Sequence, residues 1–490
     1  MKNKFYKFTA IALAATIALT SAASGDVAVA KKKKKKAPKL NKKSVSLLIG
    51  GKTTLKVKNV TKKQKKKIKW TSKKKSVATV KKGVVKAKKQ GSAKIIAKVG
   101  KKKLTCKVTV LGPVTSMKEK FAPLFTNFGT CINYNSWSAG KQLQTKSTMA
   151  FVNKHFNSVT MENEMKPDAI LGSSITSISV AEAKKLGYVV PSGYKETKVP
   201  KLNFDTVDKV LEICKNNNLR LRAHTLVWHS QTPSWFLSAN YENKKAASKS
   251  VMNARMELYI KSYMKHVMDK EIALNGSAGS IVYAWDVVNE YLHSVNFGNN
   301  FTWGSVYGTE ITTKCEYVKR AFQFAYEELQ AYKATDKVTL FYNDFNEYDV
   351  ADKIVDLINY VNKGEKNKIC GGIGMQSHVD VTYPGVSKYA EALKKFIATG
   401  LEVQITELDI TTTFNDNTRT DKDQTKYALE LMKAIANVQK TRDVTKTKGI
   451  TGITMWGLYD KISWRASDKP LFFKSLKMPK NSYYSLMKAF

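Results

Sequence analysis

Two glutamates stand at the ends of apolar runs that lie far apart in the chain. Glu290 follows run 281–288, and Glu407 lies near the end of run 403–408. Hydrolysis of an acetal by acid/base chemistry requires one carboxyl group that keeps its proton and a second that stays ionised. Carboxylates from separate runs, among them Glu290 and Glu407, are therefore candidates for such a pair, and the chemistry that they suggest is glycoside hydrolysis.

Side chains suited to binding sugars follow the other apolar runs. Tryptophan covers the apolar CH faces of a sugar, and Asn, Gln, His and Lys bind its hydroxyls. Any one of these residues alone is better explained as a solvated loop residue or a satisfied core histidine, but that explanation does not account for their recurrence at nearly every run. The set is Glu162, Asn163, Glu164, Lys166, His224, Trp228, His229, Gln231, Asn289, Asn343, Asp344, Gln376, Ser377, His378, Asp409, Trp456, Trp464 and Arg465.

Neither a metal nor another cofactor is predicted. No cluster of His, Asp or Glu is left with metal-ligand spacing, and the five scattered cysteines contain no Cys-x-x-Cys pair. No phosphate-binding loop of the Gly-x-x-x-x-Gly-Lys type occurs.

Eight apolar runs alternate with helical patterns after residue 113. Such an order predicts an α/β fold, the TIM (β/α)8 barrel, whose active site lies at the carboxyl ends of the strands. That rule places all the residues named above at one rim. The runs are 128–132, 158–161, 219–228, 281–288, 337–342, 371–375, 403–408 and 450–456, and helical stretches include 204–216, 246–270 and 349–362.

The charge of the chain is concentrated in one segment. The net charge is +45, yet residues 31–112 hold 32 lysines with no Arg, Asp or Glu, and residues 113–490 carry about +11. Residues 1–30, with a basic start and a short apolar run, are typical of a secretory signal peptide rather than a membrane anchor. We expect three parts: signal peptide 1–30, lysine-rich domain 31–112 and barrel domain 113–490.

The lysine-rich segment alternates apolar and polar residues between glycine-containing turns, which predicts a small all-β sandwich. It resembles a bacterial Ig-like domain of group 2. The resemblance rests on three stretches: Trp70-Thr71-Ser72, Ser76-Val77-Ala78-Thr79-Val80, and Gly83-Val84-Val85-Lys86-Ala87 leading to Gly91-Ser92-Ala93.

The segment from about Met117 to Phe490 resembles glycoside hydrolase family 10, the xylanases. Six motifs carry the resemblance: Phe156 to Lys166, His224 to Gln231, Trp285 to Glu290, Gly374 to His378, Ile405 to Asp409, and Trp456-Gly457 with Asp460 to Arg465. The resemblance implies a retaining endo-β-1,4-xylanase whose partner is xylan.

The resemblance also implies a role for each site residue. Glu290 matches the acid/base and Glu407 the nucleophile, with Asn289 at the sugar 2-hydroxyl and His378 and Asp409 around the nucleophile. Trp456 and Trp464 match aromatic walls. Sugar-binding positions on the glycone side are matched by Glu162, Asn163, Lys166, His224, Trp228 and Gln376.

The segment departs from the family pattern at two places, and two other functions remain open. Pro167 stands where the family often has Trp, and the stretch 172–200 is longer than usual, which leaves the distal subsites open. The alternatives are a related β-1,4-glycanase acting on glucan and a surface protein that only binds polysaccharide. Both glutamates being present speaks against the second.

We expect the lysine-rich domain either to bind a polyanion or to bind nothing specifically. An acid-free segment carries a strong positive field. An anionic cell-wall polymer, acidic lipid or glucuronic-acid-bearing xylan fits it, and so does a role as a solubilising spacer. Export and the absence of Arg argue against nucleic acid. We expect a secreted monomer that is associated with the cell wall if the tethering role holds.

Overall fold

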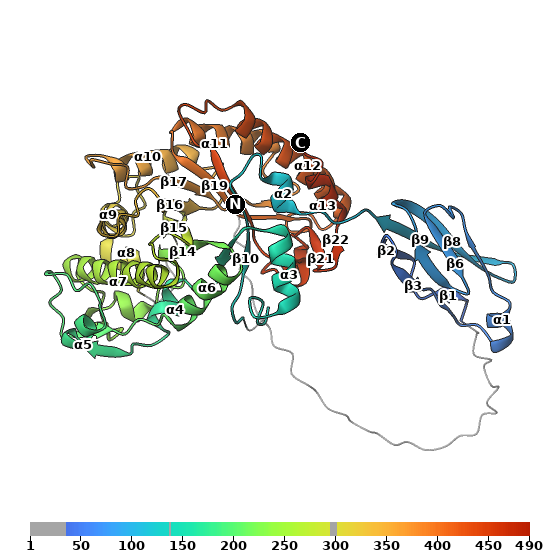
Figure 1. Ribbon diagram of the computed structural model, residues 1–490, viewed down its shortest axis with the longest axis horizontal. Helices are drawn as coiled ribbons and strands as arrows, with labels where there is room; N and C mark the ends of the chain where they lie inside the picture. The colour runs from blue at the N-terminus through green and yellow to red at the C-terminus, as the bar shows by residue number, and fades with distance from the viewer. Residues whose placement is uncertain (1–35, 137–138, 295–300) are drawn as a thin grey trace, which may run out of the picture. The chain divides into compact units, whose positions relative to one another are not determined.

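The computed structural model describes residues 36–136, 139–294 and 301–490 (Figure 1). They form two compact units that divide between Gly112 and Pro113. The expected signal peptide, residues 1–30, lies outside the described residues. No described helix is long and apolar enough to cross a membrane. All five cysteines are described, and they are free thiols.

The first unit is a β-sandwich with a four-stranded sheet, order β2-β9-β8-β5, a three-stranded sheet, order β3-β7-β6, and a small pair β1-β4. Apolar and polar residues alternate at residues 54–57, but this segment is not one strand, because it is divided between β3 and β4. The elements are β1 (Lys39–Leu40), β2 (Ser44–Leu48), β3 (Lys52–Thr54), β4 (Val57–Lys58), α1 (Lys62–Lys66), β5 (Lys69–Ser72), β6 (Ala78–Lys81), β7 (Val84–Ala87), β8 (Gly91–Val99) and β9 (Lys102–Leu111).

Alternation along these strands separates the core from the solvent. In β8 the inward positions Ala93, Ile95 and Ala97 are almost fully buried, whereas Lys94 and Lys98 on the opposite face are exposed. This is the period of two expected for strands with one buried face. The result is a core of small and branched apolar residues under a surface of lysines.

The second unit is a closed barrel of eight parallel strands, as the eight apolar runs predict. The order is β17-β16-β15-β14-β11-β10-β20-β19, and pairing of β17 with β19 closes the ring. Most of its strand residues are buried on both faces, as in other parallel sheets covered by helices. The strands are β10 (Asn127–Ile132), β11 (Ser158–Met161), β14 (Arg220–Trp228), β15 (Val282–Asn289), β16 (Thr339–Asp344), β17 (Gly372–Met375), β19 (Glu402–Thr411) and β20 (Ile450–Met455).

Helices surround this barrel (Figure 1). The longest, α7, begins after Ser248, whose side chain accepts from the backbone of Val251, and ends at Gly276 in the left-handed conformation. The helices are α2 (Met117–Phe121), α3 (Lys146–His155), α4 (Pro167–Leu171), α5 (Val180–Lys185), α6 (Asp205–Asn216), α7 (Lys249–Asn275), α8 (Trp303–Tyr307), α9 (Glu316–Ala331), α10 (Ala351–Asn362), α11 (Val386–Ala398), α12 (Asp421–Thr441) and α13 (Asn481–Leu486). Short strands β18 (His378–Asp380), β21 (Phe473–Ser475) and β22 (Met478–Pro479) extend the loops.

The long stretch 172–200 folds into a separate small layer. It contains helix α5 and the antiparallel pair β12 (Ser177–Ser179) and β13 (Lys198–Pro200). Its apolar residues form a cluster with Ala254 and Leu258 of α7. The buried Arg255 of α7 joins it by an ion pair with Glu196. The stretch is therefore anchored on the outside of the barrel.

A buried ion pair fills the barrel interior below the strand ends. Arg222 of β14 contacts Asp286 of β15, and both side chains are almost completely inaccessible to solvent. Arg222 Nε also donates to Gln404 Oε1 of β19 at 2.9 Å. Asp286 Oδ2 lies 2.8 Å from His224 Nδ1, so this pair holds the His224 ring toward the rim.

Candidate active site

A cleft of about 660 Å³ lies at the carboxyl ends of the barrel strands. It is lined by twelve of the thirteen residues to which the family resemblance assigns a role. The exception, Asp409, lies behind His378 at 3.1 Å. The twelve are Glu162, Asn163, Lys166, His224, Trp228, Asn289, Glu290, Gln376, His378, Glu407, Trp456 and Trp464.

Backbone and side-chain hydrogen bonds hold Glu290 in one orientation at the end of β15. Its backbone has a positive φ of 58°, and its N–H donates to the carbonyl of Asn343 at 2.8 Å. Its side chain accepts from Trp228 Nε1 at 2.7 Å and from Gln376 Nε2 at 2.7 Å. Burial raises the pKa of Glu290, with the nearby negative charge of Glu407 adding to it, although the two hydrogen bonds act in the opposite direction. Glu290 is therefore the carboxyl group suited to hold a proton.

Glu407 on β19 is the opposite case. Its Oε1 accepts from Asn343 Nδ2 at 2.9 Å, and its Oε2 lies 3.2 Å from His378 Nε2. Burial alone would raise the pKa of Glu407, but the hydrogen bond with His378 and the positive charges of His224, His378 and Lys166 outweigh it and lower that pKa to about 2. Glu407 is therefore the carboxyl group suited to stay ionised while Glu290 holds its proton.

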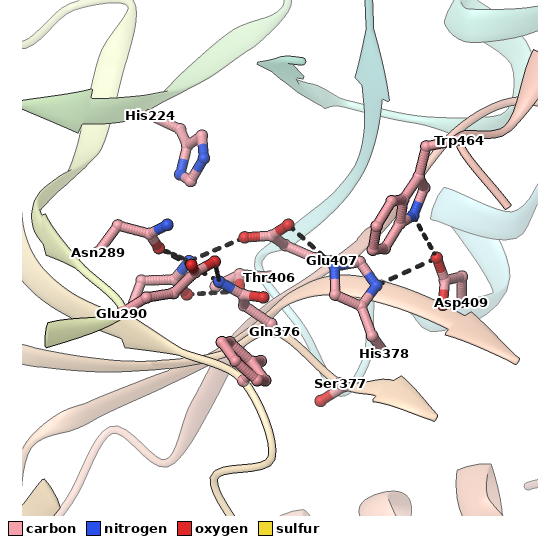
Figure 2. A network of polar contacts seen from close by, with 12 residues as sticks. His224, Asn289, Glu290, Gln376, Ser377, His378, Thr406, Glu407, Asp409 and Trp464 are labelled. Atoms are coloured by element: carbon pink, nitrogen blue, oxygen red, sulfur yellow. Dashed lines mark hydrogen bonds and ion pairs between the residues drawn. The ribbon is translucent and has the colours of Figure 1, made fainter. Parts of the chain in front are cut away.

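A chain of contacts fixes the side of Glu407 that faces His378 (Figure 2). His378 Nδ1 lies 3.1 Å from Asp409 Oδ2, and the same oxygen accepts from Trp464 Nε1 at 2.9 Å. Burial opposes a charge on His378, yet the Asp409 and Glu407 carboxylates raise the pKa of His378 to about 9. A cationic His378 therefore stabilises the Glu407 carboxylate.

Amides connect the two glutamates on the other side. Asn343 Nδ2 donates to Asn289 Oδ1 at 2.9 Å as well as to Glu407, and Thr406 Oγ1 donates to Asn343 Oδ1 at 2.7 Å. Asn289 Oδ1 also accepts from Gln376 Nε2 at 3.3 Å. With its oxygen occupied twice, Asn289 keeps its NH₂ group for another acceptor.

One wall of the cleft combines a cation with polar groups from the loop after β11. Lys166 Nζ lies 4.7 Å from the centroid of the Trp228 ring and donates to Gln231 Oε1 at 3.1 Å. Glu162 Oε2 accepts from Asn133 Nδ2 at 2.6 Å. Such fixed donors and acceptors beside an indole face suit the hydroxyls and the CH face of a sugar.

The cleft also contains two predicted tryptophans and several residues that the sequence interpretation missed. Trp456 is buried, whereas Trp464 is 54% exposed and forms a free edge. Arg465 lies 4.4 Å from the Trp464 ring and 5.1 Å from that of Phe414. The missed lining residues are Phe345, Asn346, Tyr348, Asp380, Tyr383, Phe414 and Asn415, whereas Gln231 and Arg465 belong to the motifs identified in the sequence.

Most of these residues stand on loops, where no periodic pattern marks them. Phe345 and Asn346 directly follow the end of β16, so the rule used for the other strands identifies them if the search extends past Asp344. No residue of the stretch 172–200 lines the cleft, although it follows the second barrel strand.

Comparison with known proteins gives the family. The family model described as glycosyl hydrolase family 10 matches residues 116–489. The chain belongs to this family. The model of the bacterial Ig-like domain (group 2) matches residues 36–109, so the first unit is a domain of that type.

Curated relatives in family 10 cover the barrel. Endo-1,4-beta-xylanase A of Butyrivibrio fibrisolvens is 41% identical over 377 residues, which are 76% of this chain and 84% of that protein. The bifunctional endo-1,4-beta-xylanase XylA of Ruminococcus flavefaciens is 32% identical over 77% of this chain and 34% of its own length. The chain therefore spans most of the first relative and about a third of the second.

Solved structures of family 10 agree with the fold. The CBM22-1–GH10 modules of Clostridium thermocellum endo-1,4-beta-D-xylanase 10B, complexed with xylohexaose, align with a TM-score of 0.60 at 30% identity, covering 76% of this chain and 67% of that one. A GH10 xylanase from termite gut that contains a bacterial Ig-like domain aligns over 91% of this chain and 98% of its own, with a TM-score of 0.59 and 23% identity. The second likeness concerns the fold alone.

Proposed function

We propose that this chain is a secreted, retaining endo-β-1,4-xylanase that hydrolyses internal xylosidic bonds of xylan by double displacement. The observation that best supports it is the opposite perturbation of two carboxyl groups in one cleft. Burial raises the pKa of Glu290, whereas the pKa of Glu407 falls to about 2 despite burial. A proton donor and an ionised carboxylate are the pair that glycosidases require, and membership of family 10 supports the retaining course.

In the first step, Glu290 gives its proton to the glycosidic oxygen as the Glu407 carboxylate attacks the anomeric carbon. The bond to the leaving sugar breaks, and a glycosyl ester on Glu407 forms. In the second step, the Glu290 carboxylate takes a proton from water, whose oxygen attacks the same carbon and releases Glu407. The free NH₂ of Asn289 is available to the 2-hydroxyl of the sugar in both steps.

The proposal that xylan is the substrate is based on the relatives of this chain. The proteins from B. fibrisolvens and R. flavefaciens are named as endo-1,4-beta-xylanases, and the aligned C. thermocellum structure holds xylohexaose. An exoglucanase of Acetivibrio thermocellus is also a relative, at 27% identity. Comparing hydrolysis of unsubstituted xylan with that of carboxymethylcellulose tests the choice, and faster hydrolysis of the cellulose derivative would overturn it.

Export and wall association complete the proposal. Residues 1–30 have the composition of a secretory signal peptide, and the Ig-like domain holds only basic charges. We place the enzyme outside the cell as a monomer, with this domain attached to an anionic polymer of the wall. Detection of the enzyme in the wall fraction, and its release by salt, is the expected result; a cytoplasmic enzyme would contradict it.

The two glutamates are tested by chemical rescue. Glu290→Ala should lose most activity on xylan but much less on an aryl xylobioside, because an activated leaving group needs little protonation. Azide should then partly restore turnover, because it attacks the anomeric carbon of the glycosyl ester without needing a general base, and it should yield a β-glycosyl azide as Glu407 is released.

Glu407→Ala is the matched control: it should lose activity on both substrates in the absence of azide, and any azide-dependent turnover of the aryl xylobioside should yield the α-glycosyl azide. Equal losses for the two variants, or release of the α-anomer first as followed by NMR, would refute the assigned roles.

A further inference from the structure

The exposed face of the sheet β2-β9-β8-β5 carries lysines directly opposite one another. Lys98 of β8 pairs in register with Lys69 of β5 on one side and Lys103 of β9 on the other. Lys94 of β8 pairs with Lys107 of β9. All five side chains are exposed. We call these five residues the lysine face.

The lysine face has the geometry of two parallel rows. Strands in a sheet are about 4.8 Å apart, so Lys69, Lys98 and Lys103 form one row across the strands. Lys94 and Lys107 form the second row, about 13 Å away along the strands. Between them lies a registered row of shorter side chains, Thr71, Ile96 and Thr105.

This arrangement is unfavourable unless something neutralises it. Like charges directly opposite each other in a sheet are destabilising. No acid is present to compensate, because residues 36–112 contain 27 lysines and no Asp or Glu. The other sheet is less charged on its exposed face: Lys52 pairs with Lys86, but the exposed Val84 pairs with Thr54 and Lys81. The lysine face is thus the strongest ordered array of charge in this domain's described sheets.

The geometry points to the lysine face as the docking site for a linear phosphodiester polymer of the polyol-phosphate type, lying along the row Thr71–Ile96–Thr105 between the two lysine rows. The inference rests on the wall association proposed above and assigns its surface and ligand. Charge complementarity is the basis, since an anionic chain would relieve the repulsion in both rows at once.

The choice of ligand follows from the use of lysine alone. Arginine recognises carboxylate or phosphate through a planar fork, whereas lysine acts as a point charge. Binding by point charges is selected by charge density, which favours a polymer with one charge in every repeat over a xylan that carries uronic acids only on occasional side groups. Such binding releases counterions and therefore weakens steeply with salt.

The test is a binding titration of the full chain against purified poly(glycerol phosphate) at several salt concentrations. The face variant carries Lys94→Gln, Lys98→Gln, Lys103→Gln and Lys107→Gln. The control variant carries Lys62→Gln, Lys63→Gln, Lys65→Gln and Lys66→Gln, which removes the same charge from the exposed helix α1. We expect the face variant to bind about 10- to 100-fold more weakly at low salt, with a log–log salt slope shallower by about 3. The control variant should lose less than about threefold.

Folding is controlled in two ways. The face variant should unfold at or above the wild-type temperature in calorimetry, because it loses like-charge pairs. The charge-preserving variant with Arg at the same four positions should bind as the wild type does, and weak binding by a folded Arg variant would contradict the proposal.

Different failures have different meanings. Wild-type protein that binds none of the anionic polymers refutes the wall association itself. Equal losses in the face and control variants refute the lysine face alone, since binding then follows total charge. Tighter binding to DNA or to glucuronoxylan than to poly(glycerol phosphate) at equal salt overturns the assigned ligand.

Discussion

Trp228 and His378 each contact a different glutamate of the cleft. The indole N–H of Trp228 donates to Glu290, and His378 lies against Glu407. Since a hydrogen bond to a carboxylate favours its ionised form, each contact lowers the pKa of its own glutamate. Trp228 therefore affects the limb of the rate–pH profile that Glu290 sets, and His378 affects the limb that Glu407 sets.

We predict that the two limbs move independently. In the wild type, kcat/KM on xylan should fall at alkaline pH as Glu290 loses its proton, and at acid pH as Glu407 gains one. Trp228→Phe removes a donor to Glu290, raises its pKa further and should shift the alkaline limb upward by roughly 0.5–1 pH unit. His378→Gln removes the cation beside Glu407, raises that pKa from about 2 and should shift the acidic limb upward. Rate–pH profiles of both variants measure this, and a shift of the same limb in both would contradict it.

At the scale of strands, the buried pair Arg222–Asp286 connects β14 and β15. Asp286→Ala leaves the Arg222 guanidinium buried without a carboxylate, and we expect the free energy of unfolding to fall by about 3–5 kcal/mol in urea denaturation. The control is Asp352→Ala on α10, which breaks the exposed pair with Lys395 and should change stability by less than about 1 kcal/mol. Similar losses of stability in both variants would show that the buried pair contributes no more to the free energy of unfolding than the exposed pair does.

The strands and the residues at their ends were predictable because apolar runs have a local pattern. All eight runs form barrel strands, and the rule that active sites lie at their carboxyl ends places Glu290 and Glu407 in one cleft. Tyr383 and Phe414 were missed because the path of a loop depends on tertiary packing. The double hydrogen bond of Asn343 was missed for a related reason, since it joins three strands and is invisible in any one of them.

The division at strand β3 shows the limit of alternation as evidence. Residues 54–57 alternate, yet Leu55 is buried between two short strands, where its N–H donates to the carbonyl of Gly83. Alternation reports which side chains are buried, whereas strand continuity depends on the partner that the backbone finds. The position of stretch 172–200 is similar: its order in the chain suggests the cleft, but its apolar residues pack on α7.

At the scale of the whole molecule, the two units have separate cores and separate chemistry. All residues that line the cleft lie between Glu162 and Arg465. We predict that a chain beginning at Pro113 keeps the wild-type kcat on a short soluble xylo-oligosaccharide. It should lose retention on an anionic wall preparation. A reduced kcat with intact folding would show that the Ig-like domain takes part in the reaction.

The absence of any acidic residue or histidine from residues 36–112 separates two kinds of environmental response. Carboxyl groups and imidazoles are the side chains that normally change charge in acidic to neutral water, and all the described ones belong to the barrel. Acidification should therefore alter the turnover of the enzyme and leave the proposed attachment to an anionic polymer unchanged. Salinity does the reverse, because it screens the lysines and hardly affects a buried pair of glutamates. An organism that keeps this enzyme on its surface would shed it into brackish water without inactivating it.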